Sequence, residues 1–207
     1  APGGTDIQCP AIVAVNVSMP FNIPNSLTWA RIALIPFFVG IYYLPADVIS
    51  AEGKNLVATV TFVVAAVTDW FDGYLARSLG QTSAFGAFLD PVADKLMVAA
   101  ALIVLVHLGR VDSLIALVII GREITISALR EWMAQMGAHG LVKVAGLGKL
   151  KTIVQMTAIS CLLFQEDLWL LPVFKLGEWL LAIAAALTLW LGWDYLRAAW
   201  PTMRKKG

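Results

Sequence analysis

The sequence predicts an all-α, polytopic integral membrane protein with six transmembrane helices and a short N-terminal interfacial segment. Its 207 residues are 59% apolar and only 14% charged, with a mean hydropathy of +0.79. An ordinary soluble domain contains about 25% charged residues. Six apolar stretches also approach the roughly 20 residues that a helix needs to cross a bilayer. The net charge of +1 gives no support to a nucleic-acid partner.

The expected elements follow in order along residues 19–207, which we expect to form one domain. Residues 1–18 differ in style from the rest and lack the basic region and apolar core of a signal peptide, so we expect them to be an added extension before Met19. Residues 20–25, which contain two prolines, are the expected interfacial segment. The six expected spans are 27–44, 56–76, 85–108, 113–132, 150–164 and 173–193, the last of which can be extended to 197.

Lysine and arginine residues indicate how these spans are oriented. With a cytoplasmic amino terminus, six spans return the carboxyl terminus to the cytoplasm, and the opposite side keeps only Lys54, Arg110 and Lys175. This asymmetry follows the positive-inside rule. It predicts an inner (cytoplasmic) membrane protein with both termini in the cytoplasm. The cations on the cytoplasmic side are Arg31, Arg77, Lys95, Arg122, Arg130, Lys143, Lys149, Lys151, Arg197, Arg204, Lys205 and Lys206.

Four aspartates stand out in residues 69–94 of this apolar chain. Asp69 and Asp72 are three residues apart, and Asp90 and Asp94 are four apart, so each pair lies on one face of a helix. The polar stretch SLGQTS between the pairs predicts a turn, and antiparallel packing of the two helices would bring the carboxylates together at the cytoplasmic face. Four anions in a small apolar site need a compensating cation. An all-oxygen ligand set favours Mg²⁺ or Mn²⁺. The alternative is a buried charge network that only locks the two helices.

A second polar group lies in residues 121–156. Arg122 and Arg130 are eight residues apart and share a helical face, whereas Lys149 and Lys151 are two apart and diverge on an ideal helix. These four cations form a candidate phosphate site beside the acids. Arg31, in the first span, is a further candidate for this site.

The acidic stretch matches a known signature at eight fixed positions. They are Asp69, Asp72, Gly73, Ala76, Arg77, Gly86, Asp90 and Asp94. The pattern resembles that of the CDP-alcohol phosphatidyltransferases. The resemblance implies two Mg²⁺ or Mn²⁺ ions held by Asp69, Asp72, Asp90 and Asp94, with Asp94 also acting as the base. It implies a homodimer and a CDP-diacylglycerol site at Asp69, Asp72, Gly73, Ala76, Arg77 and Gly86.

Further segments narrow the resemblance to one branch of the family. They are NIPN at 22–25, LDPVADK at 89–95, Arg122-Glu123, and GKLKT at 148–152. They are similar to those of members whose acceptor is sn-glycerol 3-phosphate, which is expected to bind Arg122, Arg130, Lys149, Lys151 and Arg31. The implied reaction gives phosphatidylglycerophosphate and CMP, the first committed step toward phosphatidylglycerol and cardiolipin.

Two alternatives stay open at this point. One is the same chemistry with another acceptor: inositol phosphate, serine, or phosphatidylglycerol as in a cardiolipin synthase. A neutral lipid acceptor would not need the cation cluster. The other alternative is a transporter of divalent cations that uses the four acids as its site. It predicts polar residues through the whole membrane depth, and the second and third expected spans are mostly apolar away from their acids.

Overall fold

The computed structural model describes the backbone of residues 23–79, 84–135, 145–167 and 171–206. Within these ranges it does not describe the side chains of residues 23–27, 70–79, 84–88, 90, 134–135, 145–147, 198–199 and 201–206. The predicted all-α class is confirmed over the described ranges. The elements are α1 (Ile23–Tyr43), α2 (Ala51–Leu79), α3 (Ala84–His107), α4 (Ser113–Gln135), α5 (Ala145–Phe164) and α6 (Val173–Lys206).

Local polar contacts explain where several helices begin and end. The Ser50 hydroxyl accepts a hydrogen bond from the Gly53 amide, and the Asp112 carboxylate accepts one from the Leu114 amide, so these residues cap α2 and α4. After α3, Gly109 adopts a left-handed φ of 68°. The next amide, that of Arg110, then bonds back to the carbonyl of Leu105 at 2.9 Å, which closes the helix end.

Several helices extend beyond the apolar stretches that predicted them. α1 begins at Ile23, so residues 23–25 of the expected interfacial segment form its first turn, whereas 20–22 lie outside the described residues. α5 begins at Ala145 rather than 150, and α6 continues to Lys206 rather than ending at 193 or 197. A helix is held by its own backbone hydrogen bonds, so it continues through polar flanks that a search for apolar spans leaves out.

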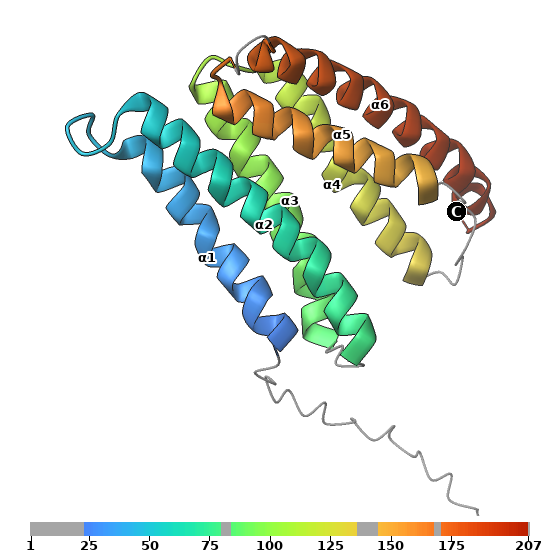
Figure 1. Ribbon diagram of the computed structural model, residues 1–207. Coiled ribbons are helices and arrows are strands. Elements are labelled where there is room, and N and C mark those ends of the chain that lie inside the picture. Colours follow the sequence, from blue (N-terminus) through green and yellow to red (C-terminus); the bar gives the residue numbers. More distant parts are fainter. Residues whose placement is uncertain (1–22, 80–83, 136–144, 168–170, 207) are drawn as a thin grey trace, which may run out of the picture.

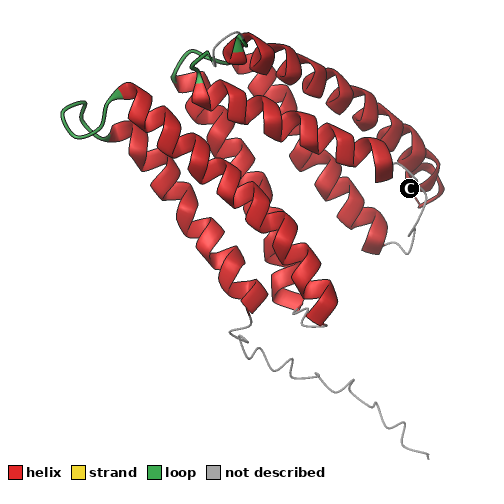
Figure 2. Cartoon of the chain, viewed as in Figure 1, coloured by secondary structure: helices red, strands yellow, loops and turns green. Residues whose placement is uncertain are grey.

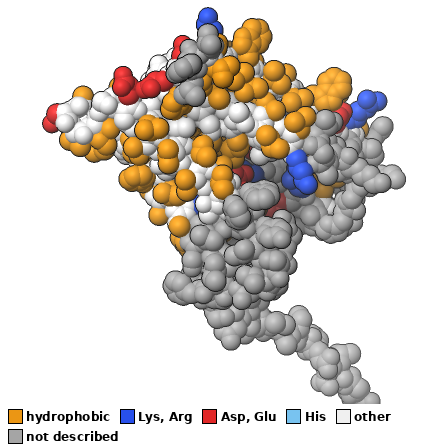
Figure 3. Space-filling view, in the orientation of Figure 1, with side chains coloured by type: hydrophobic (Ala, Val, Ile, Leu, Met, Phe, Trp, Pro, Cys, Tyr) orange, Lys and Arg blue, Asp and Glu red, His pale blue; other side chains and the backbone are white. Residues whose placement is uncertain are grey.

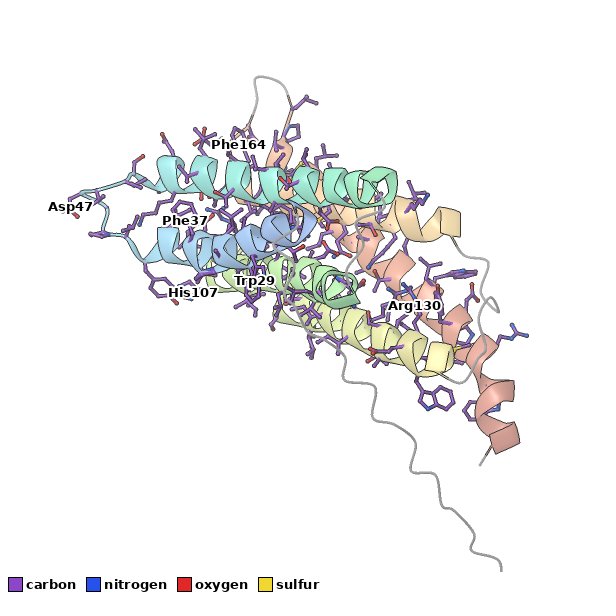
Figure 4. The ribbon with its side chains drawn as sticks, turned by 90° about the horizontal axis from the view of Figure 1, so that it is seen from below. Trp29, Phe37, Asp47, His107, Arg130 and Phe164 are labelled. Atoms are coloured by element: carbon purple, nitrogen blue, oxygen red, sulfur yellow. The ribbon has the colours of Figure 1, made fainter. Side chains whose placement is uncertain are left out.

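Successive helices run in opposite directions, and α5 and α6 are tilted relative to α1 and α2 (Figure 1, Figure 2). α1 packs against both α2 and α3, α2 packs against α5, and α5 packs most extensively against α6. The buried face of α3, from Ala93 to Leu105, supplies much of the core, with Phe38, Phe62 and Leu162 from its neighbours. The start of α1, the end of α2 and the end of α4 lie at one end of the molecule, which we call the site end (Figure 1). The 44–50 loop, with Asp47, lies at the other end, and Arg130 lies toward the site end (Figure 4).

Large apolar side chains cover much of the outer surface (Figure 3). The outer face of α2 exposes four large apolar side chains at helical spacing: Leu56, Val60, Val63 and Val67. A surface helix of a water-soluble protein shows the opposite arrangement, with its apolar side chains turned toward the core. In the described part of the chain, Val173–Arg197 of α6 is long and apolar enough to cross a membrane, and most of that stretch is not buried in the bundle. Of the six helices in the described ranges, α6 alone meets the length and composition of a membrane span, so the other five spans stay a prediction.

A polar cluster ties the bundle together at the end opposite the site. Arg110 donates to the carbonyls of Leu162 and Leu163, at 3.1 and 2.9 Å, in the last turn of α5. It also donates to the Asn55 side chain of α2 at 2.8 Å. The Asn55 amide in turn donates to the Gln165 side chain at 3.3 Å. One arginine therefore joins the α3–α4 loop to α2 and caps α5, whose last carbonyls have no partners within the helix.

Gly177 allows α6 to approach α5 closely, and replacing it should loosen the pair. A Cβ at this position would lie 2.9 Å from Leu162 Cγ and 3.1 Å from the Leu162 backbone nitrogen. We expect Gly177→Ala to lower the free energy of unfolding by about 1–3 kcal/mol, as overpacking does elsewhere. The matched control is Gly40→Ala in α1, where a Cβ meets nothing within 4 Å. Thermal unfolding in detergent compares the two variants, and equal midpoints would contradict the tight contact.

Candidate functional site

Two of the four expected acids have described side chains, and they line the same pocket. Asp69 comes from the second half of α2, and Asp94 comes from the first half of α3. Because α2 ends and α3 begins at the site end of the bundle, their acids lie there. Asp72 and Asp90 belong to the same two helices, but their side chains lie outside the described residues. The same holds for the expected nucleotide-site residues Gly73, Ala76, Arg77 and Gly86.

Arg31 of α1 lies on the acidic side of the site. Its Nη1 donates to Asp69 Oδ1 at 2.6 Å, a short charge-assisted hydrogen bond. The Arg31 side chain is 3% exposed, whereas that of Asp69 is 41% exposed. The arginine is thus fixed inside the bundle, and the aspartate keeps an open side. The sequence predicts Arg31 among the acceptor-phosphate cations, and in the structure it bonds to an acid. Its role toward a phosphate stays a prediction.

Asp94 is the point where the acidic and basic groups meet. It interacts electrostatically with Asp69, Arg31, Glu123 and Lys95. Lys151 of α5 also interacts electrostatically with Asp94. The acidic group of residues 69–94 and the cationic group of residues 122–151 therefore form one neighbourhood, contributed by α1 to α5. A chemical group bound here would have carboxylates on one side and cations on the other.

The pocket beside the acids is mainly apolar. It has a volume of about 530 Å³ and lies between α2 and α5. Asp69 and Asp94 are its charged lining residues, and Thr152, Thr157 and Ser160 add hydroxyl groups. Its apolar lining consists of Val63, Ala66, Val67, Ile153 and Met156, of which Val63, Val67 and Ile153 are exposed on the outer surface. The pocket thus joins a charged end to an apolar groove that is open on the side of the bundle.

The expected acceptor cations Arg122 and Lys151 come together through Glu123. Glu123 Oε2 accepts a hydrogen bond from Lys151 Nζ at 2.5 Å and one from Arg122 Nη1 at 3.2 Å. The Lys151 side chain is 5% exposed, so its charge is withdrawn from water and needs this partner. The sequence analysis singled out the Arg122-Glu123 segment but gave Glu123 no role in the site. Its position beside Arg122, within a span, was the signal that could have found it.

The other two cations of this group lie elsewhere on the same helices. The guanidinium of Arg130 packs over the Tyr195 ring of α6, with 5.4 Å from Cζ to the ring centre. Arg122 also contacts α6, so the two arginines share a helical face, as their spacing predicts. Lys149 is exposed, whereas Lys151 is buried, so the predicted divergence of the two lysines is confirmed. The structure therefore joins Arg122 to Lys151, and it does not bring Arg130 or Lys149 into that contact.

The donor set at the acids is of the type that binds Mg²⁺ or Mn²⁺. Asp69 and Asp94 offer carboxylate oxygens, which these ions prefer. Arg31 forms an ion pair with Asp69 and also interacts electrostatically with Asp94. Among the described side chains, no group of three or more His, Cys, Asp or Glu is close enough to hold a metal ion. The described residues fit one half of the expected ligand set, and Asp72 and Asp90 would supply the other half.

Comparison with known proteins gives the same assignment over almost the whole chain. The family model described as CDP-alcohol phosphatidyltransferase matches residues 21–190. Relatives from Escherichia coli (strain K12), Shigella flexneri serotype 5b (strain 8401) and Shigella boydii serotype 4 (strain Sb227) are each 49% identical over 184 residues. These alignments cover 87% of this chain and 96% of each relative, and all three carry the name CDP-diacylglycerol–glycerol-3-phosphate 3-phosphatidyltransferase. With its matched signature, its six helices and its acid pair beside a lateral pocket, this chain belongs to the CDP-alcohol phosphatidyltransferase family.

Proposed function

We propose that this protein transfers the phosphatidyl group of CDP-diacylglycerol to sn-glycerol 3-phosphate, giving phosphatidylglycerophosphate and CMP. The observation that carries the proposal is the 49% identity to relatives named for this reaction, over 87% of the chain. The structure supports it with two carboxylates and a bridged pair of cations in one neighbourhood. A transferase that joins two phosphate-bearing substrates needs both kinds of group.

We further propose that all six helices span the inner membrane and that the site end faces the cytoplasm. Support comes from the apolar outer face of α2, the span in α6, and the greater number of lysines and arginines toward the site end. The protein is also proposed to be a homodimer. Cysteine-accessibility labelling from either side of the membrane tests the orientation, and in-membrane crosslinking tests the dimer.

The pocket between α2 and α5 is the proposed binding site of the lipid donor. Its apolar lining suits acyl chains, and its charged end at Asp69 and Asp94 suits a pyrophosphate bound together with metal ions. The opening between exposed Val67 and Ile153 would let the donor keep its tails among lipids while its head reaches the acids. The cytidine end would bind at Asp72, Gly73, Ala76, Arg77 and Gly86.

In the proposed mechanism, an acceptor hydroxyl attacks the phosphorus that bears diacylglycerol. A new oxygen–phosphorus bond forms, the bond from that phosphorus to the CMP oxygen breaks, and the hydroxyl proton passes to the Asp94 carboxylate. Asp69, Asp72, Asp90 and Asp94 would hold Mg²⁺ or Mn²⁺, which supplies charge neutralisation of the pyrophosphate when bound. Arg31 fixes the Asp69 carboxylate so that its remaining lone pairs stay directed to the open side.

Arg122 and Lys151 are the proposed anchors of the acceptor phosphate. We expect Arg122→Ala and Lys151→Ala each to raise the KM for glycerol 3-phosphate by about tenfold or more, because a charged hydrogen bond is worth about 1.5–3 kcal/mol. The KM for CDP-diacylglycerol should change much less. Steady-state CMP release with each substrate varied in turn provides the measurement. Acceptor kinetics that are unchanged in both variants would contradict this phosphate site.

The proposed function itself is tested by acceptor-dependent release of CMP from CDP-diacylglycerol by the purified protein. We expect release with Mg²⁺ or Mn²⁺ and glycerol 3-phosphate, and loss of release on chelation by EDTA that is restored by either ion. Parallel assays with inositol phosphate, serine and phosphatidylglycerol should give little or no CMP. Release with one of these acceptors in place of glycerol 3-phosphate would reassign the substrate, and metal-independent release would overturn the metal role.

A further inference from the structure

Glu123 of α4 is an acid in a group of cations, and the proposed reaction gives it no role. A single oxygen, Oε2, accepts from both Lys151 Nζ at 2.5 Å and Arg122 Nη1 at 3.2 Å. The two cations come from different helices, α5 and α4. The carboxylate therefore fixes the distance between two positive groups that would otherwise repel each other.

The two cations are also confined by their surroundings. The Lys151 side chain is 5% exposed and that of Arg122 is 13% exposed, so neither is free to move into water. On the side of α6, a Cβ at Gly192 would lie 3.4 Å from Arg122 Cγ and 3.6 Å from its Nε. Arg122 is thus confined between Glu123 on one side and the bare backbone of α6 on the other.

The bridged pair still has unused hydrogen-bond donors. An ammonium group has three N–H donors and a guanidinium has five, and the contacts to Glu123 use one from each. Arg122 Nε is buried and has no hydrogen-bond partner among the described residues. Two cations and one carboxylate leave a net positive charge. An anion with several oxygens would satisfy these donors, as a phosphate does.

We propose that Glu123 is a positioning residue that holds Lys151 and Arg122 at the separation needed to bind the acceptor phosphate together. This inference rests on the proposed function, since it concerns the acceptor of that reaction. Glu123 does not touch the phosphate; it acts through the two cations. The opposite possibility is that Glu123 occupies the place of the phosphate and competes with it. Positioning predicts weaker acceptor binding when the charge of Glu123 is removed, and competition predicts tighter binding.

The test uses the full chain with Glu123→Gln, which keeps the shape of the side chain and removes its charge. We expect the KM for glycerol 3-phosphate to rise about ten- to a hundredfold. The kcat and the KM for CDP-diacylglycerol should stay within about threefold, because a factor of three is well under 1 kcal/mol. The matched control is Glu131→Gln, two turns further along α4, where the acid is exposed and belongs to no ion pair among the described residues.

Two further variants test whether Glu123 changes acceptor binding by acting on the two cations. Glu123→Asp keeps the charge and should restore part of the acceptor affinity. Adding Glu123→Gln to Lys151→Met should raise the KM for glycerol 3-phosphate no further than Lys151→Met alone, because without Lys151 there is no pair of cations left to hold at a fixed separation. Additive effects would overturn the positioning role.

The outcomes separate this inference from the function on which it rests. Absence of acceptor-dependent CMP release by the unaltered protein would overturn the proposed function. Normal release by the unaltered protein, with a KM for glycerol 3-phosphate that is unchanged or lowered in Glu123→Gln, would overturn only the role of Glu123. A Glu123→Gln protein with lost donor binding and lost kcat would show a general structural role, which also overturns it.

Discussion

Replacing Asp94 by Asn is expected to reduce turnover by about 10²–10⁴-fold, the contribution typical of a positioned acid or base. The Asn side chain has nearly the same shape, but it cannot accept the proton of the attacking hydroxyl. Asp94 lies where the acids meet Lys95, Glu123 and Arg31, and it lines the pocket proposed for the donor. Binding of CDP-diacylglycerol should be largely retained, because Asp69, Asp72 and Asp90 are unchanged.

The measurement combines CMP release with a binding assay for labelled CDP-diacylglycerol in detergent micelles. Asp47→Asn is the control, since Asp47 is exposed in the loop at the other end of the bundle (Figure 4). Full loss of donor binding in Asp94→Asn would make Asp94 a metal or donor ligand alone. Turnover that stays near that of the unaltered protein would show that the proton passes to another group.

Arg110→Ala is expected to cause the largest loss of stability, about 3 kcal/mol or more. The change leaves the carbonyls of Leu162 and Leu163 and the Asn55 side chain without their donor. Each buried polar group left unpaired costs about 1–3 kcal/mol. Because this cluster lies at the end opposite the acids, the kcat measured well below the unfolding temperature should be nearly unchanged.

Thermal unfolding and CMP release on the same preparations test this prediction. Lys54→Ala is a suitable comparison at the same end, because Lys54 donates to a carbonyl in the exposed 44–50 region. Its midpoint should change little. If Arg110→Ala and Lys54→Ala unfold at the same temperature, Arg110 does not carry the stability that its three contacts indicate.

The sequence predicted the helices well because an apolar span leaves a clear pattern. The starts of α3, α4 and α6 lie within a residue of the expected places, and α2 ends three residues after the expected end of its span. The ends that differ most, at Ala51, Ala145 and Lys206, lie in polar flanks where hydropathy carries no information.

The candidate site was predictable in its residue types but less so in its pairings. The signature places Asp69 and Asp94 at one end, and the structure brings both to one pocket. The bond from Arg31 to Asp69 and the bridge from Glu123 to Lys151 join residues 38 and 28 positions apart. Such contacts depend on which helices are neighbours, and a single sequence does not contain that information.

The close approach of Gly192 to Arg122 also indicates how deep the proposed acceptor site lies. The apolar stretch Val173–Arg197 of α6 ends five residues after Gly192, about 8 Å along the helix at 1.5 Å per residue. In the proposed arrangement that stretch spans the bilayer, so Arg122 would lie less than two turns from one membrane border, on the side where Trp193 and Trp200 are exposed. A water-soluble acceptor would then enter only the outer part of the membrane to meet a lipid whose tails stay within it.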